Sequence, residues 1–420
     1  MGNTVTFGAV GDIALAMGVS QGIATSGVQW PFERMAPILS RADLLFGNME
    51  TVLPPPDYPE DEIDRKALIA TFPGPDCARA LKDAGFDFLN LAANHVLDAG
   101  VVGMAYTRQT LEDAGLVTAG VGRTQSEARR PALVEVDGIR FGFLCYGEDS
   151  NYSLGTRGPC YAYYTLDAVL EDVAKLRDSV DIVVVSVHAD IEFMPTPSVP
   201  RLEQFRRIAR SGANIILGHH PHVPQGCEMI DGCLVAYSLG NFIFPAYSLP
   251  YMKRHRADSA YSFVLLAEVA KDGVRSFERI PFEIMPPPEE RPHPAEGAAR
   301  DRMLRRFAEL DGYLQDEDFL RRTWSEFAKR HFESYLRLAV APVKPSRWQS
   351  FGRRVARRLG LDITPDIDLI VEELVGRLYF TAENRNCLEE VLRLARVAWE
   401  ERLNEPPDPL HRPQHRLRLK

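Results

Sequence analysis

Short apolar runs recur along the first part of the chain, and each ends in residues that can bind a metal ion. Runs of this length, with Val, Ile, Leu and Phe in succession, are typical of buried β-strands. The segments between them have apolar residues at helical spacing and predict helices, which is the element order of βαβ units. The runs are residues 6–12, 43–50, 88–95, 181–188 and 215–222.

Two further pairs of apolar segments are joined by a short turn instead of a helix. Asp137-Gly138 and Asp272-Gly273 separate these pairs, and Asp-Gly favours the tight turns of β-hairpins. Antiparallel strands are therefore expected beside parallel ones. We predict an α/β fold in which two packed mixed β-sheets are flanked by helices. The paired segments are residues 133–136 with 139–144, and 262–270 with 274–280.

The pattern changes after a proline-rich segment at residues 285–295, which predicts a linker. Beyond it, Arg, Glu, Leu and Ala recur at helical spacing and strand signals are few. We predict a first domain at 1–284, a helical region at 296–405 and a basic tail at 406–420. The candidate helices are residues 298–309, 316–338, 348–358, 366–379 and 387–403.

Composition narrows the class of protein. A chain of 420 residues exceeds the usual single core and favours two domains. Its net charge of −9 gives no reason to expect nucleic-acid binding. The six cysteines form no CxxC pair, and most lie in apolar stretches, so we expect reduced, buried thiols. We see no basic N-terminal region and no apolar stretch of membrane-spanning length, so we expect a cytoplasmic protein without a membrane anchor. The sequence does not define an oligomeric state.

The residues that end the apolar runs predict a metal centre. Open α/β sheets bind ligands outside the carboxyl ends of their strands, so these residues are expected to meet at one rim. A strand is expected to end at Gly218. If the chain beyond it stays extended, His220 and His222 face the same way. Carboxylate, amide and imidazole ligands suit one or two divalent ions, Mn, Zn, Fe or Co. The candidates are Asp12, Glu50, Asn94, His95, His188, His220 and His222.

The order of these residues resembles that of the calcineurin-like metallophosphoesterases. It resembles more closely the poly-γ-glutamate capsule synthesis (CapA-type) branch, over about residues 5–284. The resemblance implies a metal-dependent catalytic domain with the αββα sandwich of that superfamily. The segments that carry it are Gly11-Asp12, Asn48-Met49-Glu50, residues 93–100, His188-Ala189-Asp190-Ile191-Glu192, Gly218-His219-His220-Pro221-His222 and residues 237–242.

The resemblance also implies a role for each residue. Glu50 would bridge two metal ions, and His95 would act as general acid or base, oriented by Asp98. Glu192 and Asn241 would contact the substrate or support the ligands. The remaining ligands would divide into Asp12 with His222 for one ion, and Asn94, His188 and His220 for the other.

The chain departs from the phosphoesterase pattern at its first strand. That pattern has Asp-x-His, whereas this chain has Asp12-Ile13-Ala14, so one nitrogen ligand is missing. The same absence is typical of the CapA-type branch; it leaves the family resemblance intact and weakens the case for phosphatase chemistry. His219 is an additional imidazole, which strand alternation would turn away from the metals. It is expected behind the ligands or at the surface.

Three functions compete. The first is hydrolysis of a peptide-like or polyamide substrate by metal-activated water, with His95 protonating the leaving group. The second is epimerisation of a peptide, in which the metal acidifies an α-proton and His95 exchanges it; some CapA-like proteins resemble this chain and act so in peptide natural-product pathways. The third is a scaffold without activity. Deuterium uptake at an α-carbon without cleavage separates the second from the first.

Overall fold

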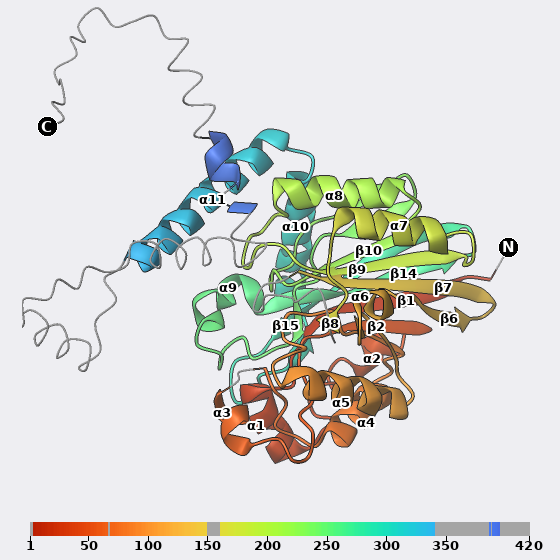
Figure 1. Cartoon of the computed structure of the whole chain (residues 1–420), viewed down its shortest axis with the longest axis vertical. Helices are drawn as coiled ribbons and strands as arrows, with labels where there is room; N and C mark the ends of the chain where they lie inside the picture. The colour runs from red at the N-terminus through yellow and green to blue at the C-terminus, as the bar shows by residue number, and fades with distance from the viewer. Residues whose placement is uncertain (1–2, 66–67, 149–159, 341–385, 388, 395–420) are drawn as a thin grey trace, which may run out of the picture. The chain divides into compact units, whose positions relative to one another are not determined.

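The computed structural model describes residues 3–65, 68–148, 160–340, 386–387 and 389–394 (Figure 1). The chain divides into two compact units. The main part of the first unit ends at Arg321, and the second unit begins at Arg322. Within the described residues, no helix is both long and apolar enough to cross a membrane. All six cysteines are buried thiols outside any disulfide, as predicted.

The first unit is built on two mixed β-sheets, which confirms the predicted fold class. One sheet has the order β16-β15-β14-β1-β2-β3-β4, with β13 also paired to β1. Its strands are β1 (Val5–Ile13), β2 (Leu44–Met49), β3 (Phe88–Asn90), β4 (Val117–Ala119), β13 (Asn241–Ile243), β14 (Tyr261–Ala270), β15 (Gly273–Ile284) and β16 (Pro292–Pro294).

The second sheet has the order β11-β12-β10-β9-β7-β6. Strands β7, β9, β10 and β12 run parallel, and β6 and β11 pair antiparallel at the two edges. The strands are β6 (Ala132–Val136), β7 (Ile139–Gly147), β9 (Ile182–His188), β10 (Ile215–His219), β11 (Cys227–Ile230) and β12 (Cys233–Ala236); β5 (Val121–Gly122) and β8 (Cys160–Tyr161) form a separate ribbon.

Aromatic side chains fill the space between the two sheets. The ring centroids of Phe88 on β3 and Phe143 on β7 are 4.0 Å apart, and those of Phe7 on β1 and Phe141 on β7 are 6.1 Å apart. These rings are fully buried, and burying such side chains supplies most of the driving force for packing the sheets. The sheets are thereby held so that their carboxyl edges lie together.

Helices cover both outer faces, as Figure 1 shows, with α7 and α8 over the second sheet and α4 and α5 on the opposite side. Side-chain caps fix the first two, since Thr165 and Ser198 accept hydrogen bonds from the first-turn amides of α7 and α8. The helices are α1 (Met17–Ser26), α2 (Ala36–Leu39), α3 (Glu60–Arg65), α4 (Gly74–Asp83), α5 (Gly100–Asp113), α6 (Gln125–Ala128), α7 (Leu166–Leu176), α8 (Val199–Arg210), η1 (Met252–Arg254), α9 (Arg256–Ser259), α10 (Gly297–Tyr313) and α11 (Glu317–Val340).

Both predicted hairpins are present. β6 and β7 pair antiparallel through Asp137 and Gly138, which both have positive φ, and β14 and β15 pair antiparallel through a turn that ends at Gly273. Positive φ at two successive turn residues matches the right-handed twist of the strands they join.

The segment predicted as a linker, residues 285–295, is in part a strand. It contains β16, which pairs with β15 from Ile284↔Pro292 to Phe282↔Pro294. Proline lacks the N–H that a central strand needs but is tolerated on an edge strand, and β16 lies at the sheet edge. The first unit also includes α10, whose Phe307 packs on Phe263 of β14 with ring centroids 5.0 Å apart.

Two of the predicted C-terminal helices are present as α10 and α11. Residues 386–387 and 389–394, within the predicted helix 387–403 or next to it, are helical. The helices predicted at 348–358 and 366–379, and the tail at 406–420, lie outside the described residues.

Candidate metal centre

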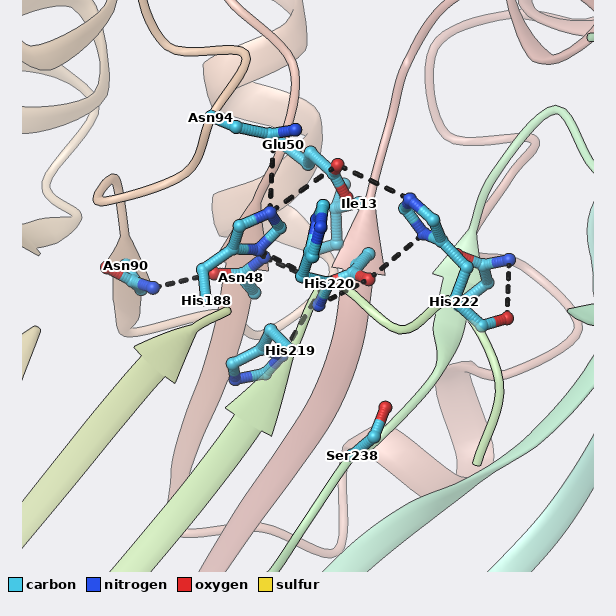
Figure 2. Close-up of polar contacts among 12 residues, drawn as sticks. Ile13, Asn48, Glu50, Asn90, Asn94, His188, His219, His220, His222 and Ser238 are labelled. Atoms are coloured by element: carbon cyan, nitrogen blue, oxygen red, sulfur yellow. Dashed lines mark hydrogen bonds and ion pairs between the residues drawn. The ribbon is translucent and has the colours of Figure 1, made fainter. Parts of the chain in front are cut away.

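The predicted ligands do meet at the carboxyl edges of the two sheets (Figure 2). Asp12 lies near the end of β1, where the register with β2 shifts, and its amide donates to the carbonyl of Gly240 at 2.9 Å. A Cβ at Gly11 would lie 1.8 Å from that same carbonyl oxygen, so only glycine allows the two backbones to approach. Glu50 follows β2, and its amide donates to the carbonyl of Ile13 at 2.9 Å.

The histidines proposed as ligands come from the second sheet. His188 is the last residue of β9 and pairs in register with His219, the last residue of β10. His220 and His222 follow with φ of 92° and 58°. The extended geometry predicted for them is therefore wrong: the chain turns at both residues, and this turn aims both rings at the cluster. The ring centroids of His220 and His222 are 5.9 Å apart.

Glu50 lies at the centre of the cluster. Its Oε1 is 3.6 Å from Nε2 of His188, 3.7 Å from Nε2 of His222 and 4.0 Å from Nε2 of His95. Both carboxylate oxygens are buried and accept no hydrogen bond in the described part of the chain. A buried carboxylate in that state is costly unless a cation compensates it.

Asp12 lies on the other side of His188. Its Oδ1 accepts a hydrogen bond from Nδ2 of Asn48 at 2.8 Å and is 3.5 Å from Nδ1 of His219, and its Oδ2 is 3.3 Å from Nδ1 of His222. His219 is fully buried against Phe46. It thus lies behind the ligands, one of the two positions expected for it.

Two groups of side chains among the described residues are close enough to hold an ion: Glu50 with His220 and His222, and Asp12 with Glu50 and His188. Glu50 belongs to both groups. The division expected from the resemblance, with His222 beside Asp12 and His188 beside His220, stays a prediction, and Nδ1 of His222 lies 3.3 Å from Oδ2 of Asp12. Asn94 Oδ1 lies 2.9 Å from Nε2 of His188, on the side predicted for it.

The carboxyl groups and imidazoles of the cluster shift one another's pKa values. Burial raises the pKa of Glu50 well above its usual range, and Asp12 adds to this rise. Burial would also raise the pKa of Asp12, but the imidazoles of His219 and His222 beside it outweigh burial and hold that pKa below its usual range. Burial would lower the pKa of His222, yet Glu50 and Asp12 raise it to about 10. A positive charge between the two carboxyl groups, such as that of a protonated His222, therefore stabilises their ionised forms.

The other two imidazoles are held neutral. Burial and then the neighbouring His222 lower the pKa of His220 to about 3, and burial with His220 lowers the pKa of His188 well below its usual range. Neutral imidazole is the form that binds metals. Neutral imidazoles, uncompensated carboxylate oxygens and a buried Nε2 of His222 that makes no hydrogen bond to any described residue together fit a divalent ion. An ion held there would replace the proton on His222 as the compensating charge.

His95 lies at the open side of the cluster. Its Nδ1 is 2.9 Å from Oδ2 of Asp98, and the imidazole is about one-fifth exposed, whereas Glu50 is fully buried. If Nδ1 donates to Asp98, then Nε2 is the acceptor that faces Glu50. The side chain of the preceding residue, Asn94, points toward His188. Asn94 and His95 thus face two different parts of the site.

Glu192 and Asn241 both contact His222. Glu192 Oε1 is 4.0 Å from Nε2 of His222 and is one-third exposed, whereas Asn241 is buried with Oδ1 2.9 Å from Nδ1. Asn241 therefore supports the ring, and Glu192 is accessible to a substrate.

Sequence reasoning assigned no role to Asn48 and Asn90, which hold the ligands in place. Asn48 Nδ2 bonds Asp12 and lies 3.0 Å from Nδ1 of His188, and Asn90 Nδ2 donates to Asn48 Oδ1 at 2.6 Å. A signal existed for Asn48, since it lies two residues before Glu50 and so shares its face of the strand.

Comparisons of the sequence with known proteins identify the family to which this fold and site belong. The sequence model of the bacterial capsule synthesis protein family, PGA_cap, matches residues 6–246, and the chain belongs to this family. This confirms the resemblance seen in the sequence.

Among its relatives, the chain is 30% identical to the capsule biosynthesis protein CapA of Bacillus anthracis over 250 residues, 57% of this chain and 60% of that protein. It is 29% identical to the PGA biosynthesis protein CapA of Bacillus subtilis over 280 residues, 66% of this chain and 70% of that protein. The chain thus spans about three-fifths of the length of the first relative.

Solved structures that resemble the chain include a hypothetical protein from Thermus thermophilus, with a TM-score of 0.44 and 16% identity over 66% of this chain and 99% of that one. A second is the 5'-nucleotidase precursor of the same organism, with a TM-score of 0.42 and 14% identity over 74% of this chain and 60% of that one.

Proposed function

We propose that the chain is a metal-dependent hydrolase of a peptide-like or polyamide substrate. The observation that carries the proposal is the Glu50 carboxylate, which is buried without a hydrogen bond from the described residues and faced by three imidazoles. One or two divalent ions, Mn, Zn, Fe or Co, would be held there. The residues that would hold them are Asp12, Glu50, Asn94, His188, His220 and His222.

A bound dication would supply Lewis acidity toward a carbonyl and lower the pKa of water. The chain's own residues supply the rest. Asp98 holds Nδ1 of His95, which turns Nε2 toward Glu50 and the reacting group. Nε2 of His95 would take a proton from the attacking water and pass it to the leaving nitrogen. Glu192, the partly exposed carboxylate beside His222, would orient the substrate.

The substrate class is supported by the names of the relatives, two of which are capsule or PGA biosynthesis proteins. A γ-linked glutamate chain is a polyamide, so its carbonyls are the groups that this site would polarise. The buried charged cluster and the partly exposed imidazole of His95 suit an amide that enters from the open side.

Epimerisation is the second candidate, because two proton carriers stand at different members of the cluster. His95 is 4.0 Å from Glu50, and Glu192 is 4.0 Å from His222. Removal of an α-proton by one and its return by the other would invert the carbon. Ala14, where the phosphoesterase pattern has histidine, is compatible with this reaction because no activated water is required.

One experiment separates these reactions. The Mn- or Zn-loaded protein is incubated with short γ-glutamate oligomers in heavy water and the products are read by mass spectrometry. We expect shorter oligomers with new amino termini, and their loss in His95→Ala at unchanged metal content; His293→Ala, on β16, is the control. Deuterium at the α-carbon without cleavage would replace hydrolysis by epimerisation. No change in the oligomers, or equal activity in His95→Ala, would overturn the proposal.

A further inference from the structure

Two aromatic rings stand beside the metal centre and take no part in the ligand set. Phe193 follows β9 and Tyr251 precedes η1, and their rings meet at 64° with centroids 6.0 Å apart. The ring of Phe193 is also 6.1 Å from the ring of His222. Phe193 is half-buried and Tyr251 is 36% exposed, so the corner between them is open to solvent on one side and next to a ligand on the other.

The backbone holds Phe193 in an unfavourable conformation. Its φ is 60°, a left-handed value that strains a residue other than glycine. Its amide donates to the carbonyl of Pro221 at 2.8 Å, and Pro221 stands between His220 and His222. The strain is thus maintained by the turn that carries two of the proposed ligands. Strained residues of this kind concentrate at binding and catalytic sites.

His255 backs the corner. Its ring stacks on Phe193 with centroids 3.9 Å apart and an interplanar angle of 6°. This stack fixes the orientation of Phe193 without involving Tyr251. His255 is exposed and is not adjacent in sequence to any of the proposed ligands. Its stacking contact therefore acts on the position of the Phe193 side chain.

The segment that carries Tyr251 and His255 is fixed at both ends. At its start, the ring of Phe244 lies 4.7 Å from that of His222, and Glu290 Oε1 accepts the amides of Tyr247 and Ser248 at 2.5 and 2.8 Å. At its end, Nδ2 of Asn241 donates to the carbonyl of Ser259 at 3.0 Å. Asn241 also contacts His222, so the corner is pre-organised relative to the centre.

We propose that Phe193 and Tyr251 form a substrate subsite beside the metal centre, which takes a planar group, an amide or an aryl ring, next to the reacting carbonyl, with His255 as a positioning residue. The proposal rests on the proposed function only in that a bound metal ion anchors the substrate. Offset and edge-to-face packing of planar groups favours such a corner. The subsite would therefore decide which residue of a peptide-like chain binds next to the centre.

The test uses two metal-chelating probes that differ in one group. Acetohydroxamate and benzohydroxamate both bind divalent ions, but only the second carries a planar ring. We expect the Mn- or Zn-loaded protein to bind benzohydroxamate about five- to tenfold more tightly in titration calorimetry. The ratio should fall to about one in Tyr251→Ala and Phe193→Ala, and partly in His255→Ala, while the affinity for acetohydroxamate is unchanged.

Tyr247→Ala is the matched control, because Tyr247 lies on the same segment but lines a different surface hollow with Arg256 and Glu283. An unchanged ratio in both Tyr251→Ala and His255→Ala would overturn the subsite, even if Phe193→Ala fails to fold. So would a failure of the loaded protein to bind either probe. If the wild-type protein does not hydrolyse the oligomers but still prefers benzohydroxamate, the proposed reaction is overturned and the subsite stays in place.

Discussion

Asp98 shows how one side chain can set the chemistry of another. It lies 2.9 Å from Nδ1 of His95 and is nearly buried, whereas His95 is partly exposed. A carboxylate in this position fixes both the ring orientation and the tautomer of its histidine. Asp98 therefore acts on the substrate only through His95.

Asp98→Asn is expected to lower the hydrolysis rate by roughly 10- to 100-fold without loss of bound metal. The amide cannot stabilise the protonated imidazole, and it can leave the wrong tautomer facing Glu50. Rates with γ-glutamate oligomers and metal content by mass spectrometry are the measurements. Asp113→Asn, at an exposed position at the end of α5, is the control. A rate within about twofold of the wild type would contradict the role given to Asp98.

Single residues of the site could be predicted as far as their types and order allow. Asp12, Glu50, Asn94, His95, His188, His220 and His222 were all named from the sequence, because each ends an apolar run. The turn at His220 and His222 could not be predicted, because the residue type does not reveal a positive φ at histidine. The grouping of the ligands depends on that turn.

At the scale of elements, the proline-rich segment is the clearest departure from expectation. It forms edge strand β16, and its Glu290 and Arg291 are buried. Arg291 Nη1 donates to the carbonyl of Trp30 at 2.7 Å, and its guanidinium lies 4.6 Å from the Trp30 ring. The prolines predicted a linker and gave no sign that residues 285–295 bind other elements of the fold.

Glu290→Ala is expected to destabilise the fold by about 1–3 kcal/mol, because the partly buried amides of Tyr247 and Ser248 would lose their acceptor. The measurement is the free energy of unfolding in urea. Glu290→Gln keeps one acceptor oxygen and should lose clearly less. Equal stability of Glu290→Ala and the wild type would show that Glu290 does not hold the segment before η1 in place.

For the first unit as a whole, the site exists only because two sheets pack against each other. Asp12 and Glu50 come with β1 and β2, whereas His188 and His220 come with β9 and β10. The stacked rings of Phe88 and Phe143 fix the separation of these sheets. The α/β class and the hairpins could be predicted from local patterns, but the pairing of ligands across the sheets depends on packing that no local pattern encodes.

The measurement that tests the metal centre most directly is the metal content of the purified chain, after incubation with Mn or Zn, for the wild type, Glu50→Ala, His220→Ala and the control His293→Ala. We expect one or two divalent ions per chain in the wild type and control, and their loss in both site variants, with circular dichroism showing an intact fold. No bound metal in the wild type, or wild-type content in both site variants, would contradict it.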